Sequence, residues 1–197
     1  KSVCFLTGIF PKIIGKYKLP SNGNYVMVSN HTSQLDIVIP ITLIKKSFAF
    51  LSKEELAKVP MFGIHFKGVH ITVNRKDTAS GVIALEDCID VLKRKINVLI
   101  FPEGTRSKKA PKMRPFKKGP FKIAIAANVP IVPLVFLDNY ERLGEGSLIK
   151  AKCGPGRSRM VVLDPISTKG KTIEDLQELL DYTYDQVNNC LKAYEVV

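Results

Sequence analysis

Short apolar runs alternate with helical patterns along this chain, and that alternation limits its fold more than any other feature of the sequence. The runs predicted to be buried strands span 25–29, 48–51, 98–101 and 131–137. Helical signals lie between them, at 33–46, after the Ser52–Glu55 capping box, at 82–95 and at 121–127. Strands that alternate with helices predict the α/β class: a single layered domain with a mostly parallel or mixed central sheet flanked by helices.

The two ends of the chain extend this plan. Further strands are predicted near 68–73, 149–152 and 160–163, and a capped helix at 172–194. A length of 197 residues without repeats or a low-complexity linker predicts one domain over 1–197. Its first part, 1–20, mixes apolar and basic residues and is expected either to lie on a membrane surface or to form an edge element. No run approaches the roughly 20 apolar residues of a membrane-spanning helix. Because the chain starts at Lys1 rather than at methionine, an anchor upstream of it stays open.

The charge of the chain is strongly basic. Thirty Lys and Arg against 18 Asp and Glu give a net charge of +12, which favours nucleic acid, anionic lipid or phosphorylated ligands as partners. Eight basic residues and no acidic residue lie between positions 106 and 122. We expect this stretch to steer a polyanionic donor or to meet an anionic membrane. A nucleic-acid-binding module is the non-enzyme alternative, but the chain lacks a recognised nucleic-acid motif and aromatic residues interleaved with the basic ones.

The four cysteines are widely scattered, with no C-x-x-C pair. No histidine pair completes a zinc site, so we expect free thiols in a reducing compartment and no metal.

The first candidate catalytic group is a histidine and an aspartate directly after the 25–29 strand. Ser33 and Asp36 have the S-x-x-D spacing of a helix start, so a strand, a turn and a helix would bring His31 back toward Asp36. A carboxylate that holds one imidazole nitrogen leaves the other free to act as a general base. The plain alternative is a histidine in a loop and an aspartate that favours a helix start. A serine hydrolase that uses Ser33 with His31 is a second enzyme alternative, although no G-x-S-x-G elbow is present.

Three further polar groups follow predicted strands. Lys53 and Arg75 each end one, and the segment 103–106 follows a third through Pro102. In open α/β sheets ligands bind at the carboxyl ends of strands, so all four groups are expected on one rim. Arg106 offers a planar fork suited to a phosphate, with Glu103 close enough in sequence to orient it. A tight turn with a surface ion pair is the alternative for this segment.

Four blocks of this sequence, in order, resemble the lysophospholipid and glycerolphosphate acyltransferase family, and most closely its 1-acylglycerol-3-phosphate acyltransferases. The blocks are Asn30-His31-x4-Asp36, Gly68-Val69-His70-Ile71-Thr72-Val73-Asn74-Arg75, Phe101-Pro102-Glu103-Gly104-Thr105-Arg106-Ser107 and Val129-Pro130-Ile131-Val132-Pro133-Leu134. The stretch Phe116-Lys117-Lys118-Gly119 also resembles a family segment. His70 departs from the aliphatic or aromatic residue that is usual at its position.

The resemblance implies a glycerolphosphate acyltransferase-like fold, with His31 as general base and Asp36 as its partner. It also implies that the acceptor's phosphate is bound by Arg75, Glu103, Gly104, Thr105 and Arg106. The implied reaction transfers a fatty acyl group from acyl-CoA or acyl carrier protein to the 2-hydroxyl of 1-acylglycerol 3-phosphate, which is lysophosphatidic acid, and gives phosphatidic acid. Glycerol 3-phosphate and other lysophospholipids are alternative acceptors.

A thioester is already activated, so we expect direct transfer with no cofactor, no metal and no covalent intermediate. From its placement at a strand end, Lys53 or a backbone N–H near it is the candidate donor to the oxyanion. We expect an enzyme associated with the anionic cytoplasmic face of a membrane.

Overall fold

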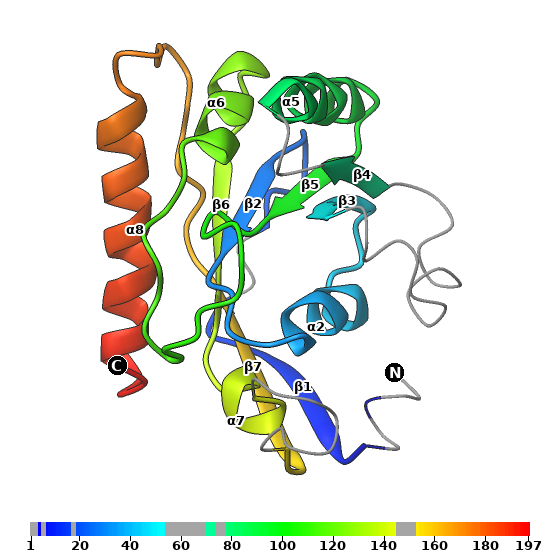
Figure 1. The fold of residues 1–197 in the computed structure, drawn as a ribbon, viewed down its shortest axis with the longest axis vertical. Helices are drawn as coiled ribbons and strands as arrows, with labels where there is room; N and C mark the ends of the chain where they lie inside the picture. Colours follow the sequence, from blue (N-terminus) through cyan, green and yellow to red (C-terminus); the bar gives the residue numbers. More distant parts are fainter. Residues whose placement is uncertain (1–3, 5–6, 17–18, 54–69, 74–77, 145–152) are drawn as a thin grey trace.

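The structure is a computed structural model that describes residues 4, 7–16, 19–53, 70–73, 78–144 and 153–197. One seven-stranded sheet runs through it in the order β1-β7-β6-β2-β5-β3-β4 (Figure 1). The strands are β1 (Ile9–Ile14), β2 (Val26–Ser29), β3 (Phe48–Lys53), β4 (His70–Val73), β5 (Asn97–Ile100), β6 (Ile131–Phe136) and β7 (Gly156–Val162). Strands β6, β2, β5, β3 and β4 are parallel to one another, whereas β7 is antiparallel to β6 and parallel to β1. The predicted mixed sheet with a parallel middle is confirmed.

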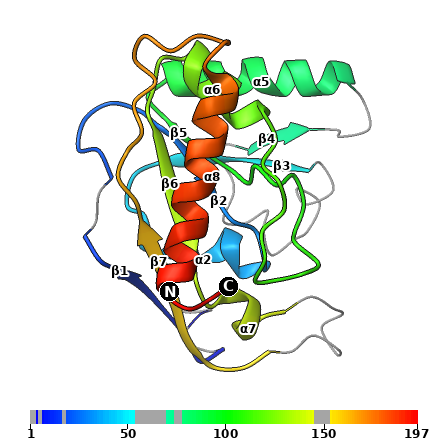
Figure 2. The ribbon, with the colours of Figure 1, turned by 90° about the vertical axis from the view of Figure 1, so that its left-hand side faces the viewer.

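Helices cover both faces of this sheet. They are α2 (Leu35–Leu43), α5 (Thr78–Lys93), α6 (Gly119–Ala126), α7 (Asn139–Arg142) and α8 (Leu176–Ala193). Figure 2 shows α8 lying across one face, with α5 and α6 near its upper end, and Figure 1 shows α2 on the opposite side. Each face therefore packs its own hydrophobic core against the sheet.

Strand β2 explains why the central strands are mainly apolar. Val26 and Val28 pack in the core under α5, α6 and α8, whereas Tyr25 and Met27 pack in the core under α2. Side chains alternate between the faces of a strand, so a strand covered on both sides needs apolar residues at every position. All four of these residues are fully buried.

The structure also corrects several expected boundaries. The helix predicted over 33–46 is shorter, because α2 spans Leu35–Leu43 with Pro40 in its last turn. Strand β3 continues to Lys53 and so includes Ser52, while the helix predicted after it lies outside the described residues. The strand predicted near 149–152 lies outside the described residues.

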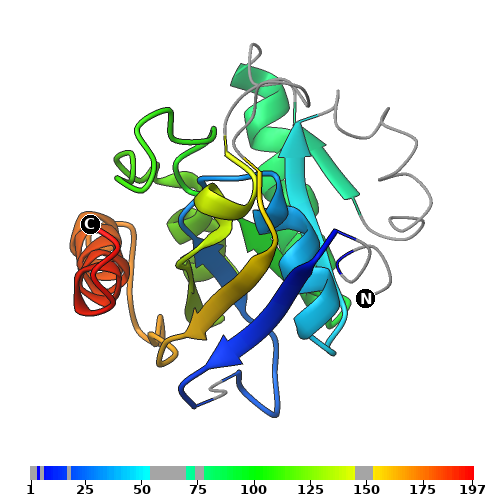
Figure 3. The ribbon, with the colours of Figure 1, turned by 90° about the horizontal axis from the view of Figure 1, so that it is seen from below.

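The amino-terminal segment contributes an edge strand. Residues Ile9–Ile14 form β1, which pairs in parallel with β7 (Figure 3). Residues 9–14 thus form an edge strand, and contact of the 1–20 segment with a membrane surface stays a prediction. No described helix combines the length and the apolar composition needed to cross a membrane.

Candidate active site

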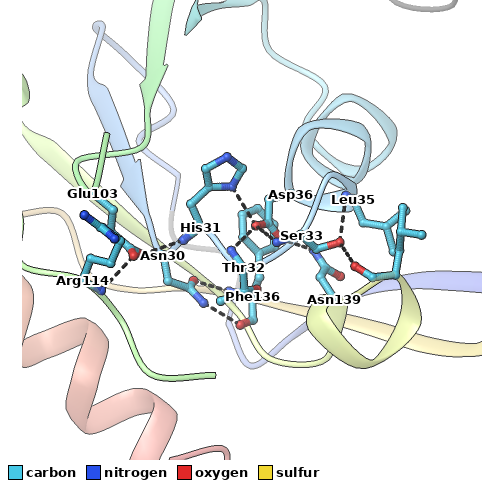
Figure 4. Close-up of polar contacts among 11 residues, drawn as sticks. Asn30, His31, Thr32, Ser33, Leu35, Asp36, Glu103, Arg114, Phe136 and Asn139 are labelled. Atoms are coloured by element: carbon cyan, nitrogen blue, oxygen red, sulfur yellow. Dashed lines mark hydrogen bonds and ion pairs between the residues drawn. The ribbon is translucent and has the colours of Figure 1, made fainter. Parts of the chain in front are cut away.

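An asparagine joins the carboxyl ends of β2 and β6 and fixes the start of the site. The side chain of Asn30 donates from Nδ2 to the backbone oxygen of Phe136 at 2.9 Å, and its Oδ1 accepts from the Phe136 N–H at 2.8 Å (Figure 4). The amide thus continues the pairing of two parallel strands by one residue beyond their backbone ladder. Sequence analysis did not assign a role to Asn30, although its place directly before His31 was the available signal.

His31 and Asp36 meet as their spacing predicts. His31 Nδ1 lies 2.9 Å from Asp36 Oδ2, with the imidazole side chain 12% exposed and the carboxylate completely buried. When Nδ1 carries the proton and donates a hydrogen bond to Asp36, Nε2 of the neutral ring keeps a lone pair and can take a proton. The ring also stacks on Phe101 with centroids 4.0 Å apart and an angle of 15° between the planes. The orientation of the His31 ring is therefore fixed, and the Asp36 carboxylate favours the tautomer with the proton on Nδ1.

Asp36 is held by four hydrogen bonds. Its Oδ2 accepts from His31 Nδ1 and from the backbone N–H groups of Thr32 and Ser33, at 2.7 and 2.8 Å respectively. Its Oδ1 accepts from Nδ2 of Asn139 at 2.8 Å. A buried carboxylate is costly unless such donors replace its water. The turn is thus built to keep a negative charge beside the imidazole.

Asn139 was missed by the sequence analysis, and so was the residue behind it. The Oδ1 atom of Asn139 accepts a hydrogen bond from the hydroxyl of Ser158, and both side chains are fully buried. Asn139 begins α7 and Ser158 lies on β7. A four-residue helix has no periodicity to detect, so no sequence signal pointed to this pair.

Ser33 is not placed as a nucleophile. Its hydroxyl donates to the backbone oxygen of Leu143 at 2.6 Å and accepts from the N–H of Leu35 at 3.1 Å. Only part of the helix start predicted from the S-x-x-D spacing is present. Asp36 accepts a hydrogen bond from the Ser33 N–H, but Gln34 rather than Ser33 is the N-cap residue of α2. A hydroxyl bound in this way speaks against the serine hydrolase alternative.

Glu103 lies elsewhere than expected for a phosphate-binding residue. It is 1% exposed, and its two oxygens accept from backbone N–H groups, Oε1 from His31 at 2.7 Å and Oε2 from Arg114 at 2.8 Å. Burial raises the pKa of this carboxyl group to about 7, with a smaller contribution from the charge of Asp36, while the two N–H groups lower it. The carboxylate is thus turned into the protein rather than toward Arg106, because it satisfies two backbone donors that burial cuts off from water.

The remaining residues of this segment form a tight turn after β5. The N–H of Gly104 donates to the backbone oxygen of Phe101, and Gly104 has a φ of +74°. The positive φ favours a glycine here, and a Cβ atom at this position would lie 2.9 Å from Cε of Lys117, so the end of that lysine side chain would have to move. Beyond it, Thr105 is exposed and Arg106 is half-buried. Lys117 is therefore a further cation beside the predicted phosphate-binding segment.

The structure brings His31, Asp36 and the segment 103–106 together at the carboxyl ends of β2 and β5. The backbone of Lys53 ends the neighbouring strand β3. Arg75 lies outside the described residues. Within the described part of the chain, no group of three or more metal-binding side chains is positioned to hold a metal ion.

Comparisons with known proteins agree with this architecture. A family model described as Acyltransferase matches residues 11–137. A Caenorhabditis elegans protein, putative 1-acyl-sn-glycerol-3-phosphate acyltransferase acl-2, is 34% identical over 98% of this chain and 67% of its own length. The mouse 1-acyl-sn-glycerol-3-phosphate acyltransferase alpha is 32% identical over 90% of this chain, which spans 62% of the mouse protein.

Among solved structures, a crystal structure of the 1-acyl-sn-glycerophosphate (LPA) acyltransferase PlsC from Thermotoga maritima is similar. It matches with a TM-score of 0.78 and 25% identity, over 95% of this chain and 73% of that one. The fold, the family model and relatives above 30% identity all lead to one conclusion: this chain belongs to the acyltransferase family.

Proposed function

We propose that the protein transfers a fatty acyl group from an acyl thioester to the free 2-hydroxyl of 1-acylglycerol 3-phosphate, giving phosphatidic acid. The observation that carries this proposal is the contact between His31 Nδ1 and Asp36 Oδ2 in a turn that buries the carboxylate. The named activity of the relatives supports the acceptor class. Acyl-CoA or acyl carrier protein supplies the acyl group.

The reaction is a direct transfer. Nε2 of His31 takes the proton of the acceptor hydroxyl while the hydroxyl oxygen attacks the thioester carbonyl. The tetrahedral intermediate then collapses, the carbon–sulfur bond breaks, and the imidazolium returns its proton to the leaving thiolate. Asp36 stabilises the imidazolium while it exists, and general-base help of this kind contributes about 10² to 10⁴ in rate.

Cations around the site take up the negative charges of the substrates. Arg106 and, from its place in the sequence motif, Arg75 are proposed to bind the acceptor's phosphate, since a guanidinium fork suits a phosphate better than an ammonium group does. Lys53 or a nearby backbone N–H donates to the oxyanion of the tetrahedral intermediate. Because this charge develops only during the reaction, donors placed for it act mainly on kcat.

The basic stretch of residues 106–122 is proposed to face the anionic cytoplasmic surface of a membrane. Its lysines and its second arginine are exposed, and its Ser107 N–H donates to the His31 carbonyl, so this surface adjoins the site. Its basic residues are Arg106, Lys108, Lys109, Lys112, Arg114, Lys117, Lys118 and Lys122. Co-sedimentation with phosphatidylglycerol vesicles but not with phosphatidylcholine vesicles, lost at high salt, is the expected result.

The decisive experiment supplies one acyl-CoA with a panel of acceptors and follows thiol release and the lipid product. We expect 1-acylglycerol 3-phosphate to be preferred over glycerol 3-phosphate and over a phosphate-free lysolipid. His31→Ala should abolish transfer in a protein with an unchanged circular dichroism spectrum. Near-normal turnover by this variant would rule out His31 as the base. A covalent acyl-protein seen by mass spectrometry would instead indicate the serine mechanism.

A further inference from the structure

We propose that Glu103 is a positioning residue: its carboxylate locks the loop that carries Arg106 onto the backbone of His31 and does not touch the acceptor. The effect of Glu103 on catalysis rests on the proposed function. The lock itself is a feature of the folded chain and can be measured without substrate.

The backbone of His31 is held on both sides by the segment that follows β5. Its N–H donates to Glu103 Oε1 at 2.7 Å, and its carbonyl accepts from the Ser107 N–H at 2.8 Å. The ring is separately held by Asp36 and by Phe101. The position of Nε2 therefore depends on the loop after β5 as much as on Asp36.

The same carboxylate closes the neck of that loop. Glu103 Oε2 accepts from the Arg114 N–H at 2.8 Å, and the Lys117 N–H donates to the Pro102 carbonyl at 2.8 Å. Residues 104–113, among them Arg106, form the loop that these two contacts close at its base. The buried side chain of Glu103 thus accepts hydrogen bonds both from the backbone of His31, the proposed general base, and from the backbone of Arg114 at the end of the loop. It fixes how far the proposed phosphate site lies from Nε2.

The chemistry of the site requires a carboxylate at this position. Two backbone donors point at Glu103, and a carboxylate has an acceptor oxygen for each, whereas a glutamine amide would turn its NH2 group toward one of them. The charged and titratable groups that act on it are Asp36, Arg114 and Tyr184. Burial is the largest influence on the pKa of Glu103 and raises it, and Asp36 adds to this effect. The two backbone N–H groups and the charge of Arg114 lower the pKa, so these are the groups that favour the ionised form bound to both amides.

A positioning role and a phosphate-binding role predict different kinetics. If Glu103 contributed to acceptor binding, its loss would raise the acceptor KM. If it sets the geometry between the base and the bound acceptor, its loss reduces kcat and leaves KM nearly unchanged, because misplacement of a reacting group acts on the chemical step.

The test compares Glu103→Gln with the wild-type chain, both labelled with [15N]histidine. The chain has three histidines, so an amide spectrum contains three backbone signals, and the His31 signal is the one that disappears in His31→Ala. An N–H bonded to a carboxylate resonates downfield, and Glu103→Gln should move this signal upfield while the other two stay in place. We expect kcat to fall about 10- to 100-fold, with the acceptor KM changed less than threefold. Arg106→Ala is the matched control, for which KM should rise and the His31 amide should stay.

An unmoved His31 amide together with a raised KM would overturn the proposal and make Glu103 a substrate ligand. If the wild-type protein shows no transferase activity, the proposed function fails, and the amide shift still decides whether the lock exists. If Glu103→Gln does not fold, the wild-type spectrum provides the answer. The His31 amide, and the Arg114 amide in a second wild-type sample labelled with [15N]arginine, should both lie downfield, and ordinary shifts for both would contradict the lock.

Discussion

The side-chain amide of Asn139 donates a hydrogen bond to Oδ1 of Asp36 at 2.8 Å, although the two residues are 103 positions apart. The other oxygen of Asp36 is used by donors from its own turn and by His31. Asn139 in turn accepts from Ser158 on β7. The candidate catalytic pair of the amino-terminal half is therefore completed by a buried contact from the carboxyl-terminal half.

Replacing Asn139 should affect both stability and turnover. Asn139→Ala leaves Oδ1 of Asp36 and the hydroxyl of Ser158 buried without this partner, which costs about 1–3 kcal/mol in free energy of unfolding. We expect kcat to fall roughly tenfold, because Asp36 loses part of its orientation. Urea unfolding and steady-state kinetics measure the two effects. Ser158→Ala removes only the outer hydrogen bond and should have the smaller effect on kcat, so the opposite order would contradict this account.

The burial of Glu103 predicts a specific dependence of stability on pH. Its pKa is raised from 4.5 to about 7 in the folded protein. Between these values the folded protein keeps a proton that the unfolded chain releases, so the free energy of unfolding falls as the pH rises from 4.5 to 7. The loss is on the order of a few kcal/mol. Urea unfolding at several pH values should show this slope in the wild type and not in Glu103→Gln, while Glu178→Gln, an exposed position on α8, should retain it.

A side chain at position 104 should destabilise the protein. Gly104→Ala places a Cβ on a residue with φ of +74° and within 2.9 Å of Cε of Lys117. A left-handed conformation costs a non-glycine residue about 1–2 kcal/mol. We expect a lower free energy of unfolding and, because Arg106 lies two residues further on, a higher acceptor KM. Gly119→Ala is the control, since nothing lies within 4 Å of a Cβ there, and equal losses from the two variants would refute the explanation.

The cysteines should differ sharply in reactivity. All four are free, and Cys153 is exposed. Burial raises the pKa of Cys88 to about 12 and that of Cys190 to about 11, which keeps both thiols protonated near neutral pH. A disulfide reagent should therefore titrate one thiol rapidly in the native protein. Cys153→Ser should remove this fast phase and Cys190→Ser should not; a fast phase that survives Cys153→Ser would show that another thiol is accessible.

The sequence predicted the strands best where burial on both faces left only apolar residues. Strand β2 and strand β5 were recognisable for this reason, within one residue of their observed bounds. The contact of His31 with Asp36 was also predictable, because a strand, a turn and a helix determine it within a few residues. Local geometry is encoded by local sequence, and both features are local.

The features that sequence analysis missed depend on contacts between distant parts of the chain. The order of the strands is one such feature. Strand β2 lies between β5 and β6, and no residue pattern within β2 predicts which strands pair with it. The orientation of Glu103 is another, because a glutamate beside a glycine and an arginine looks like a ligand group until its burial is known. Burial of a polar residue is decided by what packs over it, here the His31 turn and the backbone at Arg114.

The place of β2 in the sheet has a consequence for how this protein is made. The hydrogen-bond partner of the Asn30 side chain, Phe136, follows 106 residues later, and Asn97, which accepts from the Tyr25 N–H, follows Tyr25 by 72 residues. While the ribosome is still adding residues before β5, the apolar β2 has both edges open, which makes it a segment for chaperones to shield. Asp36 receives its fourth hydrogen bond only once Asn139 has emerged. A truncated translation product that contains the whole histidine and aspartate motif therefore still lacks the assembled pair.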